Sequence, residues 1–121
     1  MQIYLPLPSF IDSAACLDDD RLVKQLRVIG TVLGGCTSKC AVMWAKYHSA
    51  LRWYRGIIID TLAVRGAPAT VPITDWYPLT LPPWLGDDEL HASHRAALLY
   101  KDNWYKRYGW TEKPALAYVW R

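Results

Sequence analysis

Asp20 and Lys24 lie four residues apart in a segment whose apolar pattern predicts a helix, so their side chains should share one face. An amine beside a carboxylate is suited to covalent catalysis, because the amine attacks a carbon of the substrate and the carboxylate handles the proton transfers. The same spacing also describes an exposed ion pair, which adds roughly 0.3–0.5 kcal/mol to helix stability. The residues by themselves therefore fit both a catalytic pair and a solvated pair.

A second group of residues combines positive charge with aromatic rings near the end of the chain. The run from Trp104 to Tyr108 alternates rings with Lys106 and Arg107, a pattern in which cations contact phosphates and rings contact bases. The alternative is that these rings latch the C-terminal part of the chain onto the core. Arg21 and Arg27 flank Lys24 and are also predicted to contact phosphates, although a charged helix face is often simply solvated.

The histidines and cysteines do not fall into a metal-ligand pattern. His91 and His94 are three residues apart on a predicted helix, but no third ligand follows at a recognisable spacing, and Cys36-x3-Cys40 is not the usual spacing of a zinc pair. We therefore expect no metal. We expect instead that His94 and Arg95 contact DNA, the alternative being that this helical turn packs against the preceding proline-rich loop.

The composition indicates one small folded domain spanning residues 1–121. An apolar share of 52% is normal for a globular protein, and a net charge of +3 is too mild to indicate nucleic acid by itself. Seven Trp and eight Tyr are more rings than a domain of this size can bury, so several should face solvent or a partner.

The ends and the cysteines of the chain suggest where the protein works. The first residues lack the basic region and apolar stretch of a secretion signal, and no apolar run approaches the roughly 18 residues that span a bilayer. Three cysteines without such a signal argue against a disulfide framework. We expect a monomer of the reducing cytoplasm with no membrane contact.

Three main helices should position these residues, and the expected fold is all-α. A first helix is predicted from Ser9 or Asp12 to the glycine pair at 34–35, with apolar residues at helical steps. A second carries an apolar stripe that begins at Trp44, and it stops at Gly66.

The third helix should begin near Asp87, where three acidic residues favour a helix start, and run on into residues 103–109. Residues 2–8 and the tail from Pro114 to Arg121 are predicted to be extended. Residues 67–86 contain five prolines and are predicted to form an ordered loop. Its rings, Trp76, Tyr77 and Trp84, should pack across the helices.

Three segments stand out as motifs: Leu17-Asp-Asp-Asp-Arg-Leu-Val-Lys-Gln-Leu-Arg-Val28, Pro82-Pro-Trp-Leu-Gly-Asp-Asp-Glu-Leu-His-Ala-Ser-His-Arg95 and Trp104-Tyr-Lys-Arg-Tyr-Gly109. Together they resemble the pyrimidine-dimer DNA glycosylase / abasic-site lyase family of the phage endonuclease V type. The first is similar to the family's first helix, and the third to the aromatic-basic run near the end of the phage enzymes. The second, with Lys101-Asp102, looks very like a segment of unassigned bacterial relatives and is the most specific.

The resemblance implies an enzyme that binds and distorts duplex DNA, excises a damaged or modified base and nicks the strand at the abasic site. It implies an amine that attacks the sugar C1′, either Lys24 or the α-amine of Met1, with Asp20 as the carboxylate. It implies no cofactor, a partner in damaged or modified double-stranded DNA, and a bacterial or phage-infected cell. The implied DNA contacts are Arg21, Gln25, Arg27, His94, Arg95, Lys101, Trp104, Tyr105, Lys106, Arg107 and Tyr108.

Two positions depart from the family pattern. The well-studied enzymes use the amine of a small residue exposed when the initiator Met is removed, whereas Gln2 is bulky and should leave Met1 in place. The family also has a Glu on the first helix, but the only glutamates here are Glu89 and Glu112. Two alternatives therefore stay open: a catalytically silent DNA-binding protein, such as a phage-encoded regulator, on the same fold, or a protein-interaction domain that uses its exposed rings.

Overall fold

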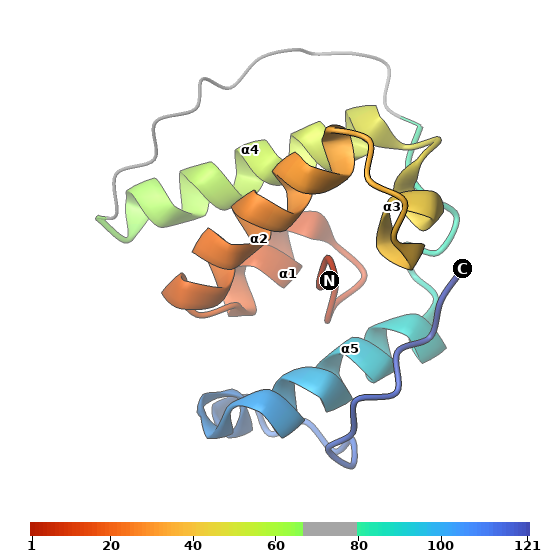
Figure 1. Ribbon diagram of the computed structural model, residues 1–121. Helices are drawn as coiled ribbons and strands as arrows, with labels where there is room; N and C mark the ends of the chain where they lie inside the picture. The colour runs from red at the N-terminus through yellow and green to blue at the C-terminus, as the bar shows by residue number, and fades with distance from the viewer. Residues whose placement is uncertain (67–79) are drawn as a thin grey trace.

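The computed structural model describes residues 1–66 and 80–121, and every regular element within them is a helix (Figure 1). The elements are α1 (Phe10–Cys16), α2 (Asp19–Leu33), α3 (Lys39–Trp44), α4 (His48–Val64), α5 (Asp88–Lys101) and the 3-10 helix η1 (Asn103–Tyr108). The predicted all-α fold is confirmed for these parts of the chain. None of their helices is long and apolar enough to cross a membrane.

The predicted first helix is in fact two helices, and that prediction was wrong at its middle. Ser9 caps α1 as expected, with its hydroxyl accepting from the backbone nitrogen of Asp12 at 3.2 Å. The backbone becomes extended at Leu17 and Asp18, and the Asp18 carboxylate then accepts from the backbone nitrogen of Arg21. A capping carboxylate stabilises a new helix start more than it stabilises a helix interior, so α2 begins one residue later.

The predicted second helix is also divided, into α3 and α4, with a break after Trp44. Trp84 packs beside this break, and its ring meets those of Trp44 and Tyr47 edge-on at 5.4 and 5.0 Å. Trp84 therefore packs across the helices as predicted, whereas Trp76 and Tyr77 lie outside the described residues. The third helix begins where expected, since Asp87 caps α5, but it ends at Lys101 and η1 follows as a separate 3-10 helix.

The helices lie on two sides of the N-terminal segment. On one side α4 packs against α1 and α2, and α2 also meets α3; on the other side lies α5 with η1 (Figure 1). The segment between them is extended, as predicted, and is almost fully buried, with Ile3, Tyr4 and Leu5 each at most 2% exposed. The core therefore forms around an extended, non-helical segment of the chain.

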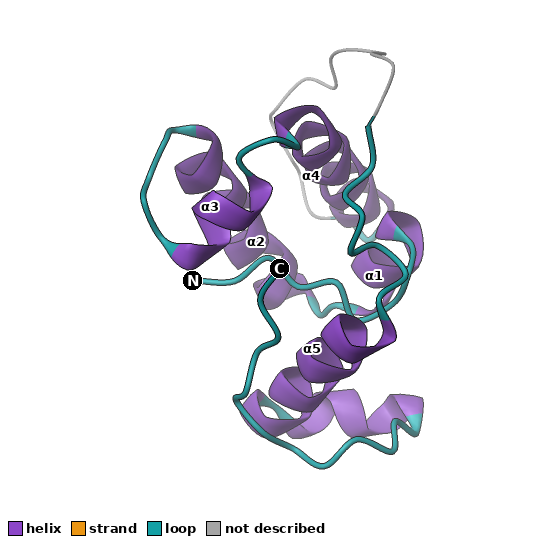
Figure 2. Cartoon of the chain, turned by 90° about the vertical axis from the view of Figure 1, so that its right-hand side faces the viewer, coloured by secondary structure: helices purple, strands orange, loops and turns teal. Residues whose placement is uncertain are grey.

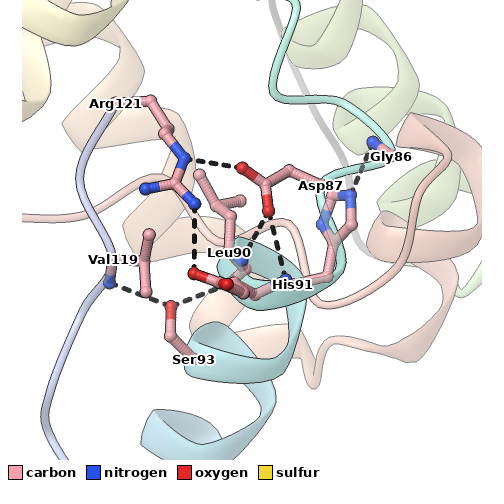
Figure 3. Close-up of polar contacts among 8 residues, drawn as sticks. Gly86, Asp87, Leu90, His91, Ser93, Val119 and Arg121 are labelled. Atoms are coloured by element: carbon pink, nitrogen blue, oxygen red, sulfur yellow. Dashed lines mark hydrogen bonds and ion pairs between the residues drawn. The ribbon is translucent and has the colours of Figure 1, made fainter.

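The C-terminal tail is extended and runs back along α5 (Figure 2). Near its start Ala115 donates from its backbone nitrogen to the carbonyl of Ala96. At its end Arg121 pairs with Asp87 at 2.6 Å, and the backbone nitrogen of Val119 donates to Ser93 at 3.1 Å (Figure 3). These contacts fix the tail beside the helix from one end to the other.

Candidate functional site

The N-terminal segment is held in place by side chains that take its backbone hydrogen bonds. The amide of Gln25 on α2 bridges two residues of the segment, since its oxygen accepts from the nitrogen of Tyr4 at 2.8 Å and its nitrogen donates to the carbonyl of Gln2 at 2.9 Å. From α4, the Tyr54 hydroxyl donates to the Tyr4 carbonyl at 2.8 Å. A buried backbone group without such a partner costs about 1–3 kcal/mol, so these bonds hold the N-terminal segment in its position.

Two histidines of α5 hold the same segment from the other side. His94 accepts through Nδ1 from the nitrogen of Leu5 at 2.8 Å. His91 accepts through Nε2 from the nitrogen of Gly86, so its Nδ1 carries the proton and donates to the Leu5 carbonyl at 2.6 Å. Burial and the neighbouring His91 lower the pKa of His94 to about 3, which keeps its ring neutral at ordinary pH.

A pocket of about 400 Å³ opens where the N-terminal segment, α2, the end of α5 and the tail meet. Its lining residues are Met1, Gln2, Tyr4, Arg21, Lys24, Gln25, Arg27, Val28, Lys101 and Tyr118. The helical residues among them follow one face of α2, at steps of three and four, together with the last residue of α5. The anchored segment adds the first residue of the chain to this face.

The pocket is strongly cationic. Four basic residues line it, Arg21, Lys24, Arg27 and Lys101, and Met1 also lines it. No carboxylate of the described residues lines it, and Asp20 is exposed outside it with no ion pair to Lys24. Asp20 as the carboxylate partner of Lys24 therefore stays a prediction, since the two residues form no ion pair and only Lys24 lines the pocket.

One wall of the pocket is a pair of phenols. The hydroxyls of Tyr4 and Tyr118 are 2.6 Å apart, and the cations of Arg21 and Lys101 lie 5.5 and 5.6 Å from the Tyr4 ring centre. Burial raises the pKa of Tyr4, and burial together with the Tyr4 hydroxyl raises the pKa of Tyr118 to about 12. Both phenols are therefore neutral at ordinary pH, and each cation near the Tyr4 ring gains a favourable cation–π contact.

The pocket brings together six of the residues that the sequence singled out: Met1, Arg21, Lys24, Gln25, Arg27 and Lys101. Gln25 has a different role from the predicted DNA contact, since it is 1% exposed and both ends of its amide bond to the backbone. It positions the amino terminus, whereas the other five offer charge or an amine to a ligand.

His94 and Arg95 do not line this pocket, and both side chains bond within the protein, so their contact with DNA stays a prediction. His94 is 1% exposed and bound to Leu5. Arg95 pairs with Glu112 at 2.6 Å and donates to the carbonyl of Pro6 at 2.9 Å, so its guanidinium joins three parts of the fold. The reason is local: both side chains face the N-terminal segment, whose backbone needs these donors and acceptors.

The aromatic-basic run of η1 is partly a core latch. Tyr105 is fully buried, stacks on Trp110 and donates from its hydroxyl to the carboxylate of Asp18, as the alternative of a core latch predicts. Arg107 lies over the Trp104 ring at 3.9 Å. Lys106, Arg107 and Tyr108 are exposed, Trp104 is half-buried, and none of the run lines the pocket.

Four lining residues were not anticipated as part of a site: Gln2, Tyr4, Val28 and Tyr118. One sequence signal was available, because Gln25 interrupts the apolar stripe of α2 between Leu22 and Ile29. A polar residue at a core position needs a buried partner, and here that partner is the N-terminal backbone. Tyr118 carried no signal, since an extended tail has no periodicity from which its contacts follow.

No family model, no curated protein and no solved structure matches this chain. The resemblance to the pyrimidine-dimer glycosylases therefore stays a prediction, and the function is inferred from the site itself.

Proposed function

We propose that this domain is a DNA-repair-type glycosylase / abasic-site lyase that binds and distorts duplex DNA, with Lys24 or the α-amine of Met1 as the nucleophile. A single observation carries the proposal: Lys24 and Met1, the two residues that bear the candidate amines, line one pocket with Arg21, Arg27 and Lys101. An amine needs a nearby electrophilic carbon, and the basic side chains supply the means to hold a phosphodiester strand beside it. An abasic deoxyribose offers both groups.

The reaction follows from ordinary amine chemistry. The amine attacks the C1′ aldehyde of the ring-opened sugar, water leaves, and an imine forms. Removal of a C2′ proton then breaks the C3′–O bond, and the phosphate departs with the bonding electron pair. The surrounding cations favour this step because negative charge grows on the departing phosphate.

Excision of an intact base requires a further catalytic group that cleavage at an abasic sugar does not. The family chemistry uses a carboxylate for the developing sugar cation, and no described carboxylate lines the pocket. The phenols of Tyr4 and Tyr118 are the neutral groups available there for proton transfer. Abasic DNA is therefore the first substrate to test, and a damaged duplex with its base still attached is the second.

Borohydride trapping tests the proposal directly. Borohydride reduces an imine to a stable amine, so wild-type protein should form a covalent complex with a duplex that holds one abasic site. Lys24→Arg keeps the positive charge but removes the nucleophile, and Lys39→Arg is the matched change at an exposed residue outside the pocket. If Lys24 reacts, only Lys24→Arg should lose the complex.

Mapping the trapped peptide separates the two amines. Trapping that survives Lys24→Arg and disappears on acetylation of the amino terminus would assign the reaction to Met1. Absence of a covalent complex with abasic DNA, together with no base release from damaged duplex, would rule out the enzymatic proposal.

The second candidate is a catalytically silent DNA-binding protein on the same fold. The absence of a described carboxylate from the pocket favours it, and so does the exposed position of Asp20. It predicts DNA binding that weakens steeply with salt but gives no trapped complex and no strand cleavage.

A further inference from the structure

The hydrogen-bonding groups of the pocket are almost all donors. The guanidinium and ammonium groups that line it can only donate, and the side-chain oxygens of the two glutamines are already used. The Gln25 oxygen accepts from Tyr4, and the Gln2 oxygen accepts from the backbone nitrogen of Ile3 at 3.0 Å. The two phenols bond to each other. A ligand that satisfies this lining must therefore offer acceptors.

Gln2 adds an uncharged donor that has no partner. Gln2 is one of the residues that line the pocket and is 5% exposed, and its Nε2, itself buried, makes no hydrogen bond within the described parts of the chain. A buried donor left in this state costs about 1–3 kcal/mol. Such a cost is removed when a bound group brings an acceptor to the amide.

We propose that this pocket is a phosphate-binding site that prefers a terminal, doubly charged phosphate, and that the Gln2 amide donates to one of its oxygens. Phosphate oxygens accept hydrogen bonds and donate none when ionised, which matches the lining. A phosphate monoester carries nearly two negative charges at neutral pH and a diester only one, and no described carboxylate opposes the extra charge.

The inference rests on the proposed function in one respect only. In the lyase reaction the departing group is a terminal phosphate, so the same site would receive it. Binding of a phosphate to the free protein does not require the reaction, and the two ideas can therefore fail separately.

The glutamine content of the chain makes a clean experiment possible. The protein has two glutamines, Gln2 and Gln25, and one asparagine, Asn103, so three side-chain amide pairs are expected in a proton–nitrogen correlation spectrum of the labelled protein. Gln25 lines the pocket but its nitrogen is already bonded, and Asn103 lies on η1 outside the pocket. These two serve as internal references.

The titration uses three ligands: inorganic phosphate, thymidine 5′-monophosphate, and the thymidine dinucleotide that has an internal diester and no terminal phosphate. We expect the first two to shift the Gln2 pair saturably and to leave Asn103 in place. The dinucleotide should need about tenfold more ligand for the same shift, as the loss of one strong charge-assisted contact implies. Equal movement of Gln2 and Asn103, no movement of Gln2, or equal affinity for diester and monoester would each overturn the proposal.

A pair of variants tests the Gln2 contact independently. Gln2→Glu keeps an acceptor for Ile3 but replaces the free donor with a negative charge, and Val23→Glu adds the same charge on α2 outside the pocket. The first should weaken binding of the monophosphate by about tenfold or more, and the second by about twofold at most. Equal weakening would mean that net charge alone sets the affinity. If Gln2→Glu does not fold, the wild-type titration still decides.

Discussion

At the scale of single residues, His94 is a neutral histidine whose ring accepts a hydrogen bond from the backbone. Its Nδ1 lone pair accepts from Leu5, so protonation of the ring would break that bond as well as bury a charge. The rings of Tyr4 and Tyr118 pack against it at 5.8 and 6.0 Å between centres, and His91 also acts on its pKa. None of these offers a negative charge to a protonated ring, which is why burial dominates and the pKa falls to about 3.

The titration of His94 should make the protein less stable in mild acid. An unfolded histidine takes up a proton near pH 6.5, whereas folded His94 does so only near pH 3, so the unfolded state binds more protons between these values. Stability from this residue is therefore complete above about pH 6.5 and declines as the pH falls toward 3. His94→Asn places an amide oxygen where Nδ1 accepts from Leu5 but cannot titrate.

We expect His94→Asn to lose less free energy of unfolding than the wild type between neutral pH and about pH 4, since one proton-linked group is removed. Urea unfolding across that range measures the difference. Identical pH profiles for the two proteins would contradict a depressed pKa at this residue.

At the scale of elements, Asp18 is the residue on which the start of α2 depends. Its carboxylate accepts from the nitrogen of Arg21 and from the hydroxyl of Tyr105, and its own backbone nitrogen donates to that hydroxyl at 3.3 Å. One side chain thus caps the helix that carries Lys24 and also holds η1 against it. Because the pocket face of α2 begins three residues later, the cap helps to set the position of the whole cationic face.

Asp18→Ala should therefore lower the free energy of unfolding by about 1–3 kcal/mol, since it removes a helix cap and leaves the Tyr105 hydroxyl without its acceptor. Asp18→Asn keeps an oxygen for only one of the two bonds, because Arg21 and Tyr105 donate to different carboxylate oxygens, and its loss should lie between those of the wild type and Asp18→Ala. The control is Asp19→Ala, which removes a surface pair with Arg65 at 2.9 Å and should cost less than about 1 kcal/mol. Similar losses for Asp18→Ala and Asp19→Ala in urea unfolding would refute the capping role.

The elements that the sequence predicted best were those with a local signal. Ser9, one of the two predicted caps, caps α1, and α5 begins at Asp87 as expected, because a capping side chain and the backbone nitrogens that donate to it are neighbours in the chain. The breaks after Cys16 and Trp44 were missed, since the apolar steps continue across both and only the packing of distant residues such as Trp84 distinguishes one helix from two.

The site was predictable to a similar degree. Lys24 and its neighbours on α2 were found because their spacing in the sequence is enough to place them on one face of a helix. The roles of Gln25, His91 and His94 were not found, because they depend on a buried N-terminal segment with no periodicity. Polar residues on the apolar faces of helices were the available sign, and they indicate buried partners more often than ligand contacts.

At the scale of the whole molecule, charge is distributed very unevenly. The net charge is only +3, yet four basic side chains gather at one pocket that no described carboxylate lines. Acidic residues lie elsewhere, where several are already paired: Asp19 with Arg65, Glu112 with Arg95, and Asp87 with Arg121. The electrostatic field therefore differs from one face of the molecule to another, and the net charge conceals this difference.

This asymmetry predicts how salt should act on DNA binding. Each phosphate that a basic side chain neutralises releases counterions, so the slope of log affinity against log salt falls by about 0.9 per contact. Arg27→Ala, in the pocket, should reduce the slope by about one unit and weaken binding at low salt. Arg52→Ala removes the same charge from the exposed face of α4, outside the pocket, and should leave the slope almost unchanged. Fluorescence anisotropy with one duplex over a salt series compares the three proteins. Equal slopes for both variants would mean that DNA does not bind preferentially at the cationic pocket, which would contradict this prediction.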